Sequence, residues 1–199
     1  MANPDYETIQ RILAGEKRAY ADLVNRHKDR AMTLALRMLK NREDAEEALQ
    51  DAFVRAFNAL PRFEWKSSFS TWLYRIVYNV CATMLSRRGE EVFTSTDEDE
   101  ESRELPATEA LQDVSYESKE FRETVQQEID RLPPIYGSVL TLFLVQDMSY
   151  DEIVEATGMP LGTVKAKLFR ARGMLRDAVL AAMNDEPQNN IARKVALKP

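Results

Sequence analysis

Apolar residues recur at helical spacing along most of the chain. Between residues 41 and 60 they fall at i, i+3 and i+4 without interruption, the period of a helix with one buried face. Similar stripes run through residues 16–38 and 118–144, and a shorter one places Tyr6, Ile9 and Leu13 on one face near the start of the chain. The first 88 residues show no alternating pattern of the kind that predicts β-strands. The hydrophobic pattern therefore predicts an all-α protein.

Two short helical patterns separated by a turn lie between residues 148 and 176. Ser149 is a good cap for the first, and Gly158 is expected to end it. The second has one apolar stripe and carries only basic charge elsewhere: Lys165, Lys167, Arg170, Arg172 and Arg176. Taken alone, a basic amphipathic helix is about as often a solvated surface helix as a DNA-binding helix. The connected unit of cap, turn and acid-free helix favours a helix-turn-helix whose second helix enters the DNA major groove.

A loop rich in aromatic, serine and basic residues precedes the helical pattern at residues 69–86. Ser68 or Ser70 is expected to cap that helix. The side opposite its apolar positions carries Trp72, Arg75, Asn79, Thr83 and Ser86. Aromatic rings beside cations suit single-stranded DNA, because each stacked base contributes about 1–3 kcal/mol. Aromatic residues at helical spacing also serve as core, so the residues alone leave both uses open.

The net charge of −6 is unevenly distributed. Residues 1–88 carry 15 basic and 11 acidic side chains, residues 89–118 carry 1 and 11, and residues 119–199 carry 11 of each. The acidic, apolar-poor middle predicts a flexible linker at 91–117. It separates expected domains at 1–90 and 118–185, and residues 186–199 are expected to form a disordered tail.

The composition disfavours an enzyme. The sequence has one cysteine, Cys81, and one histidine, His27, both at apolar positions, so neither a disulfide nor a clustered zinc site is expected. It lacks a glycine-rich phosphate loop and a nucleophile paired with a base, and we expect no cofactor. Without a signal-peptide pattern or an apolar run long enough to span a membrane, the expected site of action is the cytoplasm.

The segment from Asp44 to Phe57 resembles region 2.2 of bacterial extracytoplasmic-function (ECF, group 4) sigma factors of the sigma-70 family. The resemblance implies a promoter-specificity subunit whose polar helix face binds the clamp helices of the beta-prime subunit of core RNA polymerase. A solvated face is the alternative. The residues implied in core-polymerase binding are Asp44, Glu47, Gln50, Asp51 and Arg55.

Two further segments resemble the same family. The run SSFSTWLYRIVYN at 67–79 is similar to regions 2.3 and 2.4, which capture unpaired bases of the minus-10 promoter element. This implies roles for Lys66, Ser67, Ser68, Phe69, Trp72, Arg75 and Asn79. Residues 128–133 and 161–172 resemble region 4, whose recognition helix reads the minus-35 element. The implied residues are Thr163, Lys165, Lys167 and Arg170 for bases, and Arg172 and Arg176 for phosphates.

The resemblance also implies binding of the polymerase beta-subunit flap and of an anti-sigma factor, and a stress or envelope-signal regulon. Two alternative functions fit the sequence less well. An ordinary helix-turn-helix regulator would carry a receiver or ligand-binding domain with alternating strands, which residues 1–88 do not suggest. A sigma mimic that only sequesters an anti-sigma factor would not need the basic recognition helix.

Overall fold

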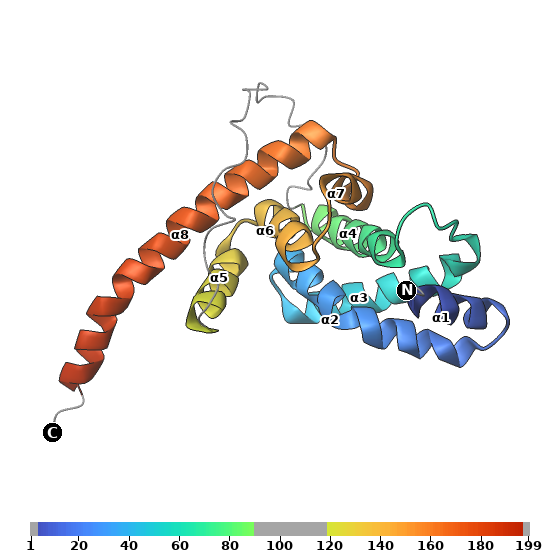
Figure 1. Cartoon of the computed structure of the whole chain (residues 1–199), viewed down its shortest axis with the longest axis horizontal. Coiled ribbons are helices and arrows are strands. Elements are labelled where there is room, and N and C mark those ends of the chain that lie inside the picture. Colours follow the sequence, from blue (N-terminus) through green and yellow to red (C-terminus); the bar gives the residue numbers. More distant parts are fainter. Residues whose placement is uncertain (1–3, 90–118, 197–199) are drawn as a thin grey trace.

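The computed structural model describes residues 4–89 and 119–196, with side chains in the second range from residue 121 to Met183. All regular secondary structure within these ranges is helical, which confirms the predicted all-α class (Figure 1). The linker expected at 91–117 lies outside the described residues. In the described part of the chain, no helix is both long enough and apolar enough to cross a membrane.

The N-terminal domain is built on three long helices that pack against one another. The side chains that fill their interface include Leu34, Met38, Ala52 and Leu73, all without exposed surface. The elements of this domain are α1 (Pro4–Leu13), η1 (Lys17–Ala19), α2 (Tyr20–Leu39), α3 (Arg42–Ala59), η2 (Leu60–Arg62) and α4 (Phe69–Arg87).

The buried face of α1 differs from the predicted one. Ile9 is buried as expected, but Tyr6 and Leu13 are about half exposed, at 49% and 47%. Asp5 lies on the buried side instead, where its carboxylate contacts His27 Nε2 at 3.1 Å and accepts a hydrogen bond from Arg26. The prediction of the face was wrong because a buried acid paired across helices looks, in sequence, like an ordinary first-turn acid.

Side-chain caps fix where α3 and α4 begin. Asn41 Oδ1 accepts a hydrogen bond from the Asp44 amide at 3.0 Å. Ser68 Oγ accepts one from the Thr71 amide at 3.0 Å, so Ser68 rather than Ser70 is the cap of α4. Each cap satisfies an amide that lacks a partner within the helix.

The C-terminal domain contains the predicted helix-turn-helix. Ser149 and Glu152 form a capping box at the start of its first helix, and Gly158 ends that helix with a left-handed φ of 74°. The predicted stripe of Val164, Leu168, Ala171 and Leu175 is buried, which confirms it. The elements are α5 (Lys119–Arg131), α6 (Pro134–Leu140), η3, a π-helical turn (Thr141–Val145), α7 (Tyr150–Thr157) and α8 (Leu161–Ala196).

Helix α8 is much longer than the recognition helix predicted from the sequence. It continues to Ala196, so most of the segment 186–199, expected to be disordered, is helical. Ala178, Ala181 and Ala182 are strong helix formers and favour continuation of the helix beyond Arg176. Figure 1 shows the end of α8 projecting away from the other helices.

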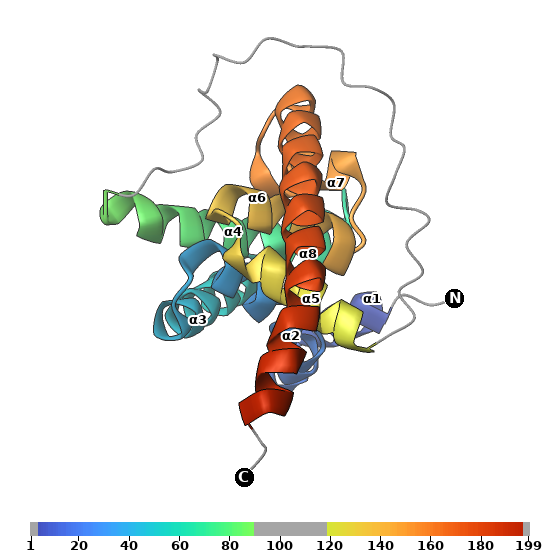
Figure 2. The same ribbon diagram turned by 90° about the vertical axis from the view of Figure 1, so that its left-hand side faces the viewer.

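The two domains are packed against each other. Helix α7 lies along α4, while α6 and the turn η3 lie against α2 (Figures 1 and 2). Residues far apart in sequence meet at this contact, as in the hydrogen bond from Tyr74 Oη to Gln146 Oε1 at 2.7 Å. The helix-turn-helix therefore lies directly beside the helix that carries the aromatic and polar strip.

Candidate functional site

The outward face of α3 carries the first group of candidate residues. Glu47 and Gln50 are exposed. Asp44, at the start of the helix, forms an ion pair of 2.6 Å with Arg88 at the end of α4, and a hydrogen bond from Arg88 lowers the pKa of Asp44. The start of this face is thus tied to the last turn of the neighbouring helix.

Further along α3, an apolar residue interrupts the polar face. Asp51 accepts a hydrogen bond from Arg55 Nε at 2.9 Å, one turn away. Beside this pair Val54 is 60% exposed, although it is a large apolar residue. Val54 was not among the candidate residues, yet the signal was present in the sequence, because a valine within a charged helix face is typical of a protein-binding surface.

The loop before α4 supplies the second group, and its members are not equally accessible. Lys66 is exposed and paired with Glu64. Ser68 is exposed but acts as the helix cap, and Ser67 Oγ donates a hydrogen bond to Glu155 of α7 at 2.6 Å. Phe69 has no exposed surface. Its ring supports the loop and cannot be reached by a base in this arrangement.

Aromatic rings hold this loop on the domain. The centroid of the Phe63 ring lies 5.0 Å from that of Trp72 and 4.7 Å from that of Trp65. The Trp65 and Tyr6 ring centroids lie 5.0 Å apart, which joins the loop to α1. Trp65 has a left-handed φ of 57°, which is unusual for a bulky residue and is retained where surrounding contacts hold it. Trp72 is half-buried and keeps some exposed surface.

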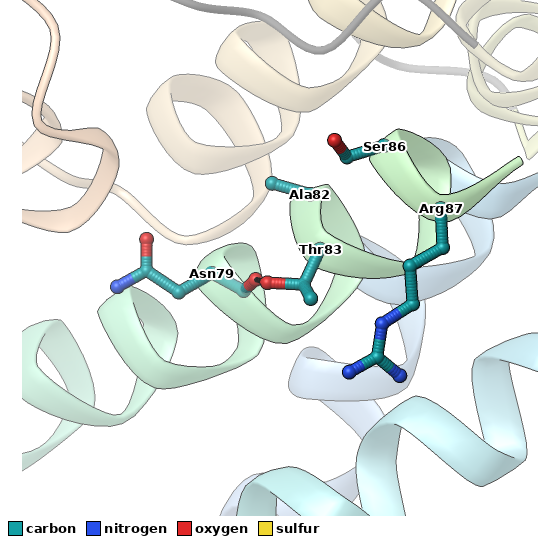
Figure 3. Close-up of a pocket in the computed structure, with 5 residues that line it drawn as sticks. All are labelled: Asn79, Ala82, Thr83, Ser86 and Arg87. Atoms are coloured by element: carbon teal, nitrogen blue, oxygen red, sulfur yellow. Dashed lines mark hydrogen bonds between the residues drawn. The ribbon is translucent and has the colours of Figure 1, made fainter. Parts of the chain in front are cut away.

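The strip along α4 continues the loop toward the end of the helix. Arg75 and Asn79 are exposed, as predicted. From Asn79 to the end of α4 a shallow, open hollow is lined by Asn79, Ala82, Thr83, Ser86 and Arg87; Figure 3 shows the Ser86 hydroxyl and the Arg87 guanidinium pointing in different directions from the helix.

The third group lies on α8. Lys165 and Arg170 are exposed, while Thr163 and Lys167 are half-buried. Arg172 turns inward: its guanidinium lies 4.6 Å from the centre of the Phe143 ring, and its Nε is buried without a hydrogen-bond partner among the described residues. Arg176 is exposed and forms a 2.9 Å ion pair with Asp177. Lys165, Arg170 and Arg176 are thus exposed, Lys167 is half-buried, and Arg172 lies against the domain core.

Cys81 and His27, the single cysteine and the single histidine of the sequence, have structural positions. Cys81 is fully buried, and burial raises the pKa of its thiol to about 12, so it is protonated and unreactive near neutral pH. His27 is 7% exposed and edge-on to Phe69. Over the described ranges, no three His, Cys, Asp or Glu side chains are grouped to hold a metal ion.

Comparison with known proteins identifies both domains. The family described as Sigma-70 region 2 matches residues 23–91, and Sigma-70, region 4 matches residues 122–175. The RNA polymerase sigma-H factor of Pseudomonas aeruginosa is 32% identical over 88% of this chain and 93% of its own length. The ECF RNA polymerase sigma factor SigW of Bacillus subtilis is 33% identical over 84% of this chain and 92% of its own.

Solved structures share the fold. CnrH, solved in complex with the cytosolic domain of CnrY, covers 90% of this chain and 99% of its own with a TM-score of 0.60 and 23% identity. The sigma factor RpoE of Bartonella quintana, solved with the anti-sigma factor NepR, covers 80% and 96% with a TM-score of 0.58 and 21% identity. The sigma-H factor and SigW align with 88% and 84% of this chain, whereas the two family descriptions match only residues 23–91 and 122–175. The chain belongs to the ECF sigma factors of the sigma-70 family.

Proposed function

We propose that this chain is a group 4 sigma subunit that binds core RNA polymerase and directs transcription initiation at promoters with minus-35 and minus-10 elements. The observation that carries the proposal is the presence of three separate surfaces in one chain: the polar face of α3, the loop and strip of α4, and the basic outer face of α8. A repressor needs only the last of these.

The face of α3 is the proposed contact with the beta-prime clamp helices. It offers exposed Glu47 and Gln50, the Asp51–Arg55 pair, and Val54 as an apolar centre. A desolvated apolar residue surrounded by polar groups is the usual composition of a stable protein interface. The beta-subunit flap is the proposed partner of the C-terminal domain.

The loop before α4 and the strip along it are the proposed minus-10 surface. Lys66 and Arg75 supply cations for phosphates, and Trp72 offers the exposed part of its ring to an unpaired base. Phe63 and buried Phe69 position that ring and do not contact DNA. The expected contribution of Phe69 is therefore to loop geometry.

The exposed face of α8 is the proposed minus-35 surface. Lys165 and Arg170 project from it, with Thr163 and Lys167 at its edge. Because Arg172 lies against Phe143, its proposed role is to fix α8 on the domain core, while Arg176 remains a candidate for phosphate contact. A helix of this kind reads bases in the major groove through arginine and lysine side chains.

The proposal includes the cellular setting implied by the family. The chain acts in the cytoplasm, performs no chemistry of its own, and is held inactive by an anti-sigma factor until a stress or envelope signal releases it. Two structural neighbours were solved with such a partner or with a cytosolic protein domain. An anti-sigma factor that covers α3 would exclude the polymerase directly.

Core binding tests the proposal. Glu47→Lys should reduce the affinity for bacterial core polymerase at least about ten-fold, because it places a like charge on a surface expected to meet basic groups. Glu7→Lys, the same change at an exposed position of α1, is the matched control and should bind as the parent chain does. The parent chain with core enzyme should produce defined start sites across bacterial genomic DNA. Absence of such start sites, or equal core affinity for both variants, would contradict the proposal.

A further inference from the structure

An aromatic pair formed by Tyr6 and Trp65 lies beside the loop before α4, and neither residue belongs to the proposed minus-10 surface. The two ring centroids are 5.0 Å apart. Tyr6 is 49% exposed on α1, and Trp65 is half-buried and keeps some exposed surface. Residue 6 also precedes residues 23–91, the range that matches the Sigma-70 region 2 description. The match to the family therefore gives Tyr6 no role.

The backbone at Trp65 has a conformation that suits glycine better than tryptophan. Its φ of 57° is left-handed, a region that a residue with a Cβ disfavours and that glycine adopts readily. Glycine at residue 65 would therefore form the same turn with less strain. Strained residues cluster at binding sites, where the surrounding structure holds them in place. The indole is thus expected to serve a purpose that the turn itself does not require.

Buried contacts fix the position of α1, and with it Tyr6, beside the loop. The carboxylate of the preceding residue, Asp5, contacts His27 Nε2 at 3.1 Å. The His27 ring is edge-on to Phe69, with 5.2 Å between the ring centroids. Phe69 begins α4 and has no exposed surface. The placement of Tyr6 next to Trp65 consequently does not depend on the contact between their two rings alone.

The pair continues the aromatic surface that Trp72 offers. The Phe63 ring centroid lies 4.7 Å from that of Trp65 and 5.0 Å from that of Trp72, so both indoles border the same phenyl ring. Their separation cannot exceed the sum of these two distances, which an unpaired strand spans within a few nucleotides. The Tyr6 and Phe63 rings are inclined to the Trp65 indole by 51° and 54°. Inclined rings cover an indole only in part, so a flat base can lie against its exposed surface.

The charges along the loop are compatible with a DNA strand at this place. Arg62 and Lys66 are exposed and flank Trp65 in the sequence. Lys66 Nζ forms an ion pair with Glu64 at 2.5 Å, in which the two side chains are 82% and 67% exposed. Exposed ion pairs contribute little to stability, so a phosphate can replace the carboxylate at little cost. Cations beside aromatic rings are the combination that single-strand binding requires.

We propose that Tyr6 and Trp65 form a second base-binding site, which takes one unpaired nucleobase of the same DNA strand whose other bases bind at Trp72. The inference rests on the proposed function, because it concerns the strand that is melted at the promoter. Every nucleobase has an aromatic face, and the pair presents rings without a dedicated set of hydrogen-bonding groups. The site should therefore add affinity for the melted strand with little sequence preference.

The sequence contains two tryptophans, so Trp65 can be observed separately from Trp72. Trp72→Phe leaves Trp65 as the only indole of the full chain. Titration of this variant with a 20-nucleotide thymidine strand should quench the indole fluorescence in a saturable manner, because a stacked base quenches an indole. An abasic strand of the same length keeps the phosphates and should quench it far less.

Two further variants, each made in the parent chain, measure the contribution of the pair to affinity. Trp65→Gly removes the indole and keeps the turn, since glycine readily adopts the left-handed conformation; Tyr6→Ala removes the other ring. Each should weaken binding of the thymidine strand, measured by fluorescence anisotropy, about five- to ten-fold through loss of one stacked base. Leu13→Ala is the matched control, because Leu13 is an apolar residue at the other end of α1 with a similar exposure of 47%. It should bind as the parent chain does.

Circular dichroism checks that each variant keeps its helices. Unchanged Trp65 fluorescence on addition of the thymidine strand would overturn the inference. Equal quenching by the abasic strand would also overturn it, as would parental affinity of either Trp65→Gly or Tyr6→Ala. The titrations use no polymerase. Stacking on Trp65 without defined start sites from the reconstituted enzyme would contradict only the sigma function, whereas defined start sites without stacking would contradict only the second base site.

Discussion

Asp5 joins α1 to α2. Its carboxylate contacts the buried ring of His27 and accepts a hydrogen bond from Arg26. Burial acts to raise the pKa of Asp5, but hydrogen bonds from His27 and Arg26 outweigh it and the net shift is downward. A depressed pKa means that the ionised form stabilises the fold above the unfolded-state value of about 3.9, and that this stabilisation is lost as the pH falls through the folded value.

We expect Asp5→Asn to lower the free energy of unfolding by about 1–3 kcal/mol at pH 7, since a charge-assisted hydrogen-bond acceptor inside the domain is lost. At pH 3 the difference from the parent chain should shrink, because this pH lies below the unfolded-state pKa and the stabilisation from the lowered pKa is then being lost. Urea denaturation at both pH values measures this. Asp29→Asn, an exposed acid on α2, is the control and should change little. An equal loss of unfolding free energy at both pH values would contradict the pairing of Asp5 with His27 and Arg26.

Helix α7 depends on its cap because it has only eight residues. Ser149 Oγ accepts from the Glu152 amide at 3.3 Å, and Glu152 Oε2 accepts from the Ser149 amide at 2.9 Å. The hydrogen bond from the Ser149 amide lowers the pKa of Glu152. Ser149→Ala should weaken the helix by about 1 kcal/mol, seen as roughly five-fold faster amide exchange in α7. Ser86→Ala on α4 should leave that exchange unchanged; equal acceleration in both would contradict the role of the cap.

The exposed cations of α8 should divide into two kinds. Arg170→Ala should lower the preference at one or two positions of the minus-35 element by about 1–3 kcal/mol each, because a base contact is lost. Arg176→Ala should instead weaken binding on all sequences and reduce the salt dependence by about one counterion. Competition binding of the holoenzyme to a promoter library measures both. A uniform loss for Arg170→Ala would refute its proposed contact with bases.

The helices were predictable because their signals are local. The apolar stripe of α8, the cap at Ser149 and the stop at Gly158 each depend on residues within one or two turns, and the structure confirms all three. The buried side of α1 was missed because Asp5 pairs with His27, 22 residues away. Phe69 and Arg172 show the same limit at the site, since only tertiary contacts distinguish an inward ring or guanidinium from an exposed one.

At the scale of the whole molecule, the sequence indicated two domains but not that they pack together. Arg37 meets Asp130 and Thr141 across 93 and 104 residues, and each looks in sequence like an ordinary surface residue. Polar residues carry no periodic signal that would predict burial between domains. The contact consequently became visible only in the folded chain.

Substitutions of Arg37 and of Asp130 should change the stability of the domain contact in opposite directions. Asp130→Ala leaves the buried guanidinium without its carboxylate and should favour separation. Arg37 is 1% exposed, and its Nη2 is buried with no hydrogen-bond partner in the described part of the chain. Arg37→Met removes this buried charge. Asp130 is 59% exposed and can be hydrated, and Thr141 keeps its hydrogen bond to the Gly137 carbonyl at 2.7 Å. Replacing a buried cation by an apolar side chain of similar length should strengthen the contact by about 1–2 kcal/mol.

The strengthened contact should leave the Arg37→Met chain at least as compact as the parent chain in solution, whereas the Asp130→Ala chain should be more extended. The radius of gyration from small-angle scattering measures both changes, and Lys28→Met, which removes an exposed cation from the same helix, is the control for the general loss of positive charge. Ion-pair loss alone would move both variants in the same direction. Opposite directions are expected only if the buried guanidinium, with its unsatisfied Nη2, weakens the domain contact that its carboxylate partner supports.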